Sequence, residues 1–356
     1  MISNRVYVDF HVIQTVPPSC VNRDDTGSPK TAVYGGVRRA RVSSQSWKKA
    51  IREMFKDHFA ESELGVRTKK IVSLVRDKII DNDPSKSEEE AIALAEEIIR
   101  ASDVKTKDKE ALALFFMSTK QADNLAVLAL SGQYDKKSIQ VALNKGSGVD
   151  VALFGRMVAD DPVLNTDASA QVAHAISTHR VDNEYDYFTA VDDRAPEDNA
   201  GAGMIGTVEY NSSTLYRYAT VSGHMLLGQL ADSPEATAKA IVEFARAFIT
   251  AMPTGKQNTF ANRTLPDGVA VVIRTDQPIN FAGAFEAPVA SNNSGYSSES
   301  MKRLVSYAKE NYKNYYGPPK KSWVIGEYFS ALGDTVNLQG LADALETELI
   351  TLFSVE

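Results

Sequence analysis

Cationic side chains recur at helical spacing in a short segment near the N-terminus. A helix that begins near Ser44 would carry on one face the side chains at i, i+3, i+4, i+7 and i+11, which are Gln45, Lys48, Lys49, Arg52 and Lys56. Its core-facing side would carry Trp47, Ala50, Ile51 and Met54. Free backbone N–H groups at the start of such a helix favour a phosphate, and Ser43 and Ser44 add two hydroxyls there. The segment predicts a track for a nucleic-acid backbone, although a solvated helix face is the simpler alternative.

The positive charge of this segment is local. The chain has 356 residues and a net charge of −7, which as an average argues against nucleic acid as a partner. Residues 20–56, however, hold nine Lys or Arg and only three Asp or Glu. Because binding depends on the local field, this contrast favours a nucleic-acid-binding surface within an acidic protein.

The loop CVNRDD at 20–25 places a guanidinium beside two carboxylates. Arg23 has the fork geometry that binds a phosphate. Asp24 and Asp25 could bind Mg²⁺ or could pair with their basic neighbours, and pairing is the simpler alternative.

Sequence signatures of catalysis are absent. The chain has no GxSxG motif, no Walker loop and no recognisable order of Ser, His and Asp. Cys20 is the single cysteine, so neither an intrachain disulfide nor a CxxC metal site can form. His174 and His179 are five residues apart, a poor spacing for two metal ligands on a helix. We therefore expect no catalytic residue, no metal and no cofactor, and a protein that is not an enzyme.

The composition is that of an ordinary globular protein, with 43% apolar residues and 24% charged residues. The length indicates two domains, or one domain with a large insertion. The N-terminus lacks the pattern of a signal peptide, and the apolar runs are far shorter than the roughly 20 residues that span a bilayer. With a single cysteine, these features predict a cytoplasmic protein.

Hydrophobic periodicity predicts a mixture of strands and helices. Strands are expected at 5–16, 37–42, 148–158 and 268–275, and helices at 44–58, 167–179, 234–251, 298–312 and 339–352. Residues 62–145 are mainly helical in pattern and are interpreted as an insertion. Without it, the order of elements is typical of an α+β sheet of the ferredoxin-like type.

Residues 184–215 predict a long β-hairpin with a Pro- and Gly-rich tip. Six aromatic side chains lie along its two arms, namely Tyr185, Tyr187, Phe188, Tyr210, Tyr216 and Tyr218. They could stack on bases or could pair across the strands, and spacing does not separate these alternatives.

Five segments that follow one another along the chain resemble a known family. They are SCVNRDD (19–25), YGGVRRARVSSQSWKKAIR (34–52), GVDVALFGRM (148–157), AHAISTHRVDNEYDYFTAVDD (173–193) and YRYATV (216–221). The similarity is to the CasC family, the repeated backbone subunit of the type I-E CRISPR surveillance complex Cascade. PTGKQNTFA (253–261) is a weaker echo of the same family.

The resemblance implies a hand-like shape. An RRM-like palm would comprise 1–58 and 216–356, a helical fingers insertion 59–180, and a hairpin thumb 184–215. Copies of the chain would stack head to tail along a CRISPR RNA, beside other Cascade subunits, and present the guide for pairing with target DNA.

The resemblance also implies roles for individual residues. It places RNA contacts at Arg23, Lys30, Ser43, Gln45, Lys48 and Lys49, to which the helical spacing adds Arg52. Met157 matches a position that wedges beside bases, and Phe188 and Thr189 match thumb residues near a displaced base. Lys136, Lys137 and Lys145 lie near the place of a lysine-rich finger helix that contacts target DNA.

Two alternatives to this non-catalytic function stay open. Related subunits of other CRISPR effectors cleave target RNA with a loop aspartate, a role that Asp24 or Asp25 could fill. A metabolic enzyme could instead bind a small phosphorylated ligand at the start of the helix, over 43–52.

Overall fold

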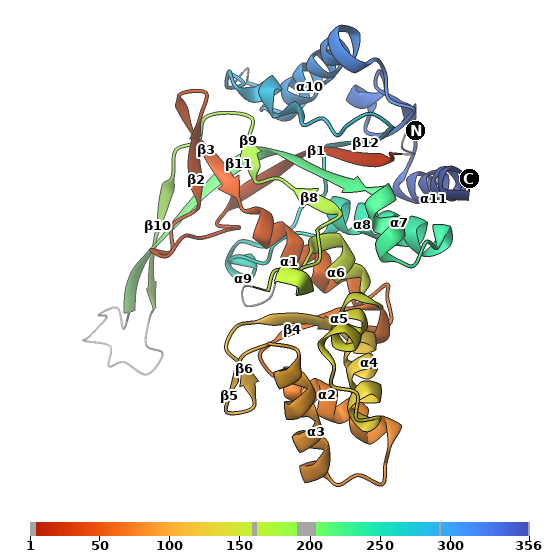
Figure 1. Ribbon diagram of the computed structural model, residues 1–356. Coiled ribbons are helices and arrows are strands. Elements are labelled where there is room, and N and C mark those ends of the chain that lie inside the picture. Colours follow the sequence, from red (N-terminus) through yellow and green to blue (C-terminus); the bar gives the residue numbers. More distant parts are fainter. Residues whose placement is uncertain (1–4, 159–161, 191–203, 292, 355–356) are drawn as a thin grey trace, which may run out of the picture.

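The computed structural model describes residues 5–158, 162–190, 204–291 and 293–354. A twisted sheet crosses the middle of the molecule, a helical lobe extends below it, and a long hairpin projects to the left (Figure 1). The fold is α+β, as the order of elements predicts. No helix among the described residues is both long enough and apolar enough to cross a membrane.

The central sheet gathers strands from the whole chain. Its order is β14 (Asp334–Thr335), β13 (Lys321–Ile325), β12 (Gly268–Arg274), β1 (Tyr7–Ser19), β11 (Met204–Ser222), β9 (Ala175–Ser177), β3 (Val37–Val42) and β2 (Thr31–Tyr34), with β8 (Ala170–Val172) also paired to β11. All neighbours are antiparallel except β13 and β14. At the centre, Phe10 lies opposite Ala219 on β11 and Val271 on β12.

Both faces of the sheet are covered by helices. One face packs against α1 (Ser44–Phe55), α7 (Gly223–Gln229), α8 (Pro234–Thr250) and α11 (Leu338–Ser354). The other face packs against the 3₁₀ turns η3 (Phe281–Phe285) and η5 (Glu327–Phe329) and against α10 (Ser297–Asn311), which continues into a π-helical turn, η4 (Tyr312–Tyr316).

β1 is buried on both faces, although its alternation of apolar and polar residues predicts one exposed face. Asp9 and His11, on its polar side, are both buried. The His11 ring stacks on Phe281 with 4.5 Å between centroids, and the Asp9 carboxylate accepts a 2.8 Å bond from the Ile279 N–H. Burial raises the pKa of Asp9 to about 6. Local alternation could not reveal this second helical layer.

The helical lobe has a hydrophobic core of its own. It contains α2 (Ile71–Asn82), α3 (Glu88–Ala101), α4 (Thr119–Leu130) and α5 (Lys136–Asn144), together with the short strands β4 (Gly65–Thr68), β5 (Thr106–Lys107), β6 (Glu110–Ala111) and β7 (Phe115–Ser118). The helical pattern predicted across 62–145 fails at 115–118, because these residues pair with β4. A short buried run such as Phe-Phe-Met has no period that separates strand from helix.

Two further predictions are wrong in the type of element: an expected strand is a helix, and an expected helix is a pair of strands. The strand expected at 148–158 is the helix α6 (Val149–Phe154), whose six residues are all buried. The helix expected at 167–179 is replaced by β8 and β9. Pairing with β11 draws 170–177 into the sheet, and this tertiary contact overrides the local propensity.

The predicted hairpin is present. β10 (Glu184–Ala190) pairs with the first half of β11, and β11 then runs on without a break into the sheet, as far as Ser222. The hairpin is therefore an extension of a central strand. Its expected tip, 191–203, lies outside the described residues.

Candidate nucleic-acid interface

The predicted basic helix forms as α1, and it begins where the sequence indicates. Ser43 is the N-cap, with an extended backbone, and its side chain accepts a 3.4 Å bond from the Ser46 N–H. Trp47, Ile51 and Phe55 are buried. The apolar face of α1 is therefore fixed against the sheet, and its polar face points away.

A buried arginine fixes the rotation of α1. The Arg217 guanidinium on β11 lies 3.8 Å from the Trp47 ring centroid and 4.7 Å from that of Phe248 on α8. It donates a 2.6 Å bond to Gln14 Oε1 on β1 and another bond to the Phe248 carbonyl. Burial lowers the pKa of Arg217 to about 9. One side chain thus connects the helix, two central strands and α8.

The outward side chains of α1 point in two directions. Lys49 and Gln45 are exposed, and Lys49 faces the loop of residues 21–27. Lys48 is half-buried, with its Nζ 5.7 Å from the Phe154 ring centroid on α6. Burial, and secondarily the charge of Arg67, lowers the pKa of Lys48. Lys48 lies at the junction with the helical lobe, whereas Lys49 lies in the adjacent cleft.

Arg52 and Lys56 each pair with a carboxylate, so they add less positive charge to the exposed face of α1 than their spacing predicts. The Arg52 Nε donates a 2.9 Å bond to Asp150 Oδ2, and its guanidinium carbon lies 4.4 Å from the Phe116 ring centroid. Lys56 pairs with Glu53 at 2.6 Å. Arg52 therefore joins α1 to α6 and to the helical lobe.

A cleft of about 750 Å³ lies beside α1, between the loop of residues 21–27 and the loop of residues 251–263. Arg23, Lys49 and Arg263 bring positive charge to it from three separate segments. Acidic residues, including Asp25 and Asp57, line the same cleft. We call this space the α1 cleft.

Two basic residues of this region were not predicted as site residues from the sequence. Arg263 lines the α1 cleft although it lies more than 200 residues after α1, and Lys256 lines a pocket of about 300 Å³ with Arg23 and Tyr185 at the base of the hairpin. Only the PTGKQNTFA echo pointed to this loop. Lys256 has a φ of +49°, in the left-handed region that non-glycine residues seldom adopt, so tertiary packing holds the loop in place.

Asp24 has a role within its own loop. Its carboxylate accepts bonds from the Thr26 hydroxyl at 2.7 Å, the Thr26 N–H at 2.9 Å and the Ser28 N–H at 3.0 Å. These bonds, led by that of the Thr26 hydroxyl, lower the pKa of Asp24. Asp25 is exposed. Within the described ranges, no three His, Cys, Asp or Glu side chains gather as ligands for a metal ion.

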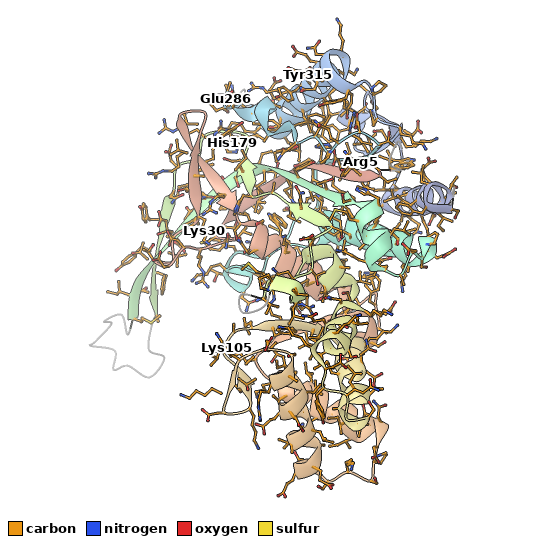
Figure 2. The ribbon with its side chains drawn as sticks, in the orientation of Figure 1. Arg5, Lys30, Lys105, His179, Glu286 and Tyr315 are labelled. Carbon is orange, nitrogen blue, oxygen red and sulfur yellow. The ribbon has the colours of Figure 1, made fainter. Side chains whose placement is uncertain are left out.

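The start of α1 carries a histidine that the sequence interpretation did not assign. His174 Nδ1 accepts a 3.2 Å bond from the Ser44 N–H and lies 3.4 Å from Arg41 Nη1. Burial, followed by the charges of Arg41 and Lys30, lowers the pKa of His174. Lys30 lies close to the base of the hairpin (Figure 2). Lys30 and Ser43, which are both predicted to contact RNA, thus lie near the start of α1.

The predicted wedge residues are available at the surface. Met157 is 85% exposed. Phe188 lies opposite Gly206 in the hairpin, and a Cβ atom at Gly206 would come within 2.4 Å of the Phe188 ring. Thr189, the next residue of β10, is also exposed. The hairpin therefore holds the Phe188 ring against the backbone of the facing strand.

The aromatic residues of the hairpin fall into two groups. Tyr185 and Tyr187 are 69% and 63% exposed. Tyr216 and Tyr218 are buried in the palm, where they contact His11, so the prediction that they belong to a projecting arm is wrong. The reason is that β11 continues from the hairpin into the sheet.

The predicted DNA-contact lysines lie on α5 and just after it. Lys137 and Lys145 are exposed and line a groove of about 910 Å³ between α4, α5 and α7. Lys136 pairs with Asp103, so part of its charge is neutralised.

The chain matches the model of the family described as CT1975-like protein over residues 8–347. It belongs to this family. The CT1975-like protein is also similar to a chain, 33% identical, in a solved structure titled "CRISPR RNA-guided surveillance complex, pre-nicking"; the TM-score is 0.83, and the match covers 96% of this chain and 100% of that one.

A second chain, in a structure titled "CRISPR RNA-guided surveillance complex", is 30% identical to the CT1975-like protein. Its TM-score is 0.63, and the match covers 96% of this chain and 99% of that one. The curated proteins include no match.

We predict that Arg52→Gln destabilises the CT1975-like protein by about 1–3 kcal/mol, because the buried Asp150 carboxylate loses its cationic partner. Adding Asp150→Asn should restore part of the loss, since it removes the unpaired charge. Urea unfolding gives the free energies, and the exposed Lys49→Gln, expected to change stability by about 0.5 kcal/mol or less, is the control. An Arg52→Gln protein with unchanged stability and weakened RNA binding would assign Arg52 to nucleic acid instead.

Proposed function

We propose that this CT1975-like protein is a non-catalytic backbone subunit that binds the guide RNA of a CRISPR surveillance complex, of type I-E as the sequence resemblance implies. The observation that carries the proposal is the convergence of Arg23, Lys49 and Arg263 on the α1 cleft. The full-length similarity to chains of two RNA-guided complexes supports it.

Gripping the sugar–phosphate backbone suits this function because a guide must keep its bases free for pairing. Lysine and arginine side chains on α1 and its neighbouring loops supply charge without reading base edges. Ser43 and Gln45 add polar groups at the start of the helix. Binding by this surface should weaken steeply with salt, because phosphate contacts release counterions.

We assign the displacement of guide bases at regular intervals to the hairpin and to Met157, which follows α6. Met157 and Phe188 would wedge beside bases, with Thr189 next to the displaced base. Phe188 suits such a role because its ring is held against Gly206 and is still 36% exposed. A rigidly held ring loses little conformational entropy when a base stacks on it.

Repetition of the subunit along one RNA requires a head-to-tail interface that does not close on itself. In the proposed assembly each hairpin reaches a neighbouring copy, and other subunits of the complex occupy the ends. Target DNA pairs with the exposed guide segments, and Lys137 and Lys145 on the helical lobe lie along its path.

Reversing two charges on α1 tests the proposal directly. Lys48→Glu with Lys49→Glu should abolish guide-dependent assembly at moderate salt, because the phosphate contact of Lys49 becomes repulsive and the neighbouring charge of Lys48 is reversed as well. Size-exclusion chromatography with and without guide RNA measures assembly. Lys86→Glu with Lys107→Glu, a half-buried and an exposed lysine of the helical lobe, is the control and should assemble normally. Full-length assembly by the α1 variant would show that this helix does not hold the guide.

Target-RNA cleavage is the second candidate function, because the exposed Asp25 carboxylate lines the α1 cleft. We expect no cleavage when the assembled complex is incubated with complementary RNA and Mg²⁺, since Asp24 is bonded within its own loop. Periodic cuts that disappear in Asp25→Ala would contradict the non-catalytic proposal. If the chain were a metabolic enzyme, its oligomer size would not depend on RNA, so the chromatography above separates that alternative as well.

A further inference from the structure

A second basic surface lies on α10, on the other side of the sheet from α1. Lys302, Lys309 and Lys313 recur at i, i+7 and i+11 along α10 and its π-helical continuation, and all three are exposed. Met301, Leu304 and Ala308 are buried beneath them, so packing fixes which side of the helix carries the lysines. Figure 2 places Tyr315, at the end of this helix, far from Lys30.

Exposed tyrosines lie at both ends of this row of lysines. Tyr315 and Tyr316 are 74% and 50% exposed in the π-helical turn. Tyr328 is 48% exposed, and Lys302 Nζ lies 5.8 Å from its ring centroid. Exposed apolar surface marks an interaction site when it gathers in a patch, whereas single exposed residues are ordinary.

The π-helical turn explains how these tyrosines become exposed. Tyr312 points inward, where its ring meets Phe281 edge to face at 5.8 Å between centroids and lies 5.5 Å from the Arg274 guanidinium carbon. With Tyr312 anchored, the turn directs Tyr315 and Tyr316 outward. Single π-helical turns of this kind occur frequently at functional sites.

Positive charge exceeds negative charge on this surface. Lys320 and Lys321 follow the same turn and are exposed. Residues 297–328 hold six Lys or Arg and three Glu in a chain of net charge −7. Among the described residues, neither Lys309, Lys313, Lys320 nor Lys321 has an ion-pair partner.

We propose that this α10 surface binds single-stranded DNA. Cations alternating with exposed aromatic rings suit a single strand, whose phosphates pair with the lysines and whose unpaired bases stack on the rings. A protein partner fits less well, because lysine is depleted at the cores of protein interfaces. In the proposed complex the natural ligand is the strand that is displaced when the guide pairs with its target, and only this last identification rests on the proposed function.

The test uses the complex assembled on guide RNA, so that the α1 cleft is already occupied. A fluorescent 30-nucleotide thymidine strand, not complementary to the guide, is the probe, and anisotropy at about 50 mM salt gives its Kd. Lys309→Glu with Lys313→Glu should weaken binding at least tenfold and should lower the salt slope by about 1.4, at about 0.7 for each phosphate contact. Tyr315→Ala with Tyr316→Ala should weaken binding at least tenfold with an unchanged salt slope.

Controls separate this proposal from that of the guide site. Both α10 variants should still assemble on guide RNA, and Lys86→Glu with Lys107→Glu should bind the probe normally. Should no complex assemble, the same variants are compared in an isolated chain that carries Lys48→Glu and Lys49→Glu, so the α10 surface is tested even if the guide proposal fails. Binding of the probe within twofold of the parent by either α10 variant would overturn the inference. Loss of another subunit with unchanged probe binding would also overturn it and would indicate a protein contact.

Discussion

Placement of α1 depends on the buried cation of Arg217. In the described part of the chain, no carboxylate pairs with this guanidinium and its Nε has no hydrogen-bond partner. Two aromatic faces, the Gln14 amide oxygen and the Phe248 carbonyl surround it. Burying a charge without a counter-ion costs free energy that only close geometry offsets. The contact with Trp47 therefore admits one rotation of the helix, and that rotation decides which way Lys48 and Lys49 point.

The same rotation of α1 explains why the side chains of two lysines adjacent in sequence lie in different parts of the molecule. Lys48 lies over Phe154, where α6 connects the palm to the helical lobe, and Lys49 faces the α1 cleft. Asp24, Asp25, Glu53 and Asp57 also line the cleft, and their repulsion restricts bound phosphates to the positions beside Arg23, Lys49 and Arg263. The α1 cleft and the α10 surface lie on opposite sides of one sheet, so each surface can be altered without the other.

Helix capping, hydrophobic periodicity and turn composition predicted the elements that depend on residues close together in the sequence. The Ser43 cap, the apolar face of α1 and the hairpin all follow from residues within a few positions of each other. Contacts between residues far apart in the sequence could not be predicted from local patterns. Asp150 binds Arg52 from 98 positions away. Arg263 reaches the α1 cleft from a loop that carries no periodic pattern. β8 and β9 form because their backbones pair with β11. α6 forms within a fully buried segment, where strand and helix have the same hydrophobic pattern.

A structure of the complex with its guide RNA is the most direct measurement. The predicted result is guide phosphates within hydrogen-bond distance of Lys49 and Arg23 in successive copies, with the bases turned away from α1. A guide that runs elsewhere, while the α1 cleft faces solvent, would contradict the assignment of this cleft to RNA.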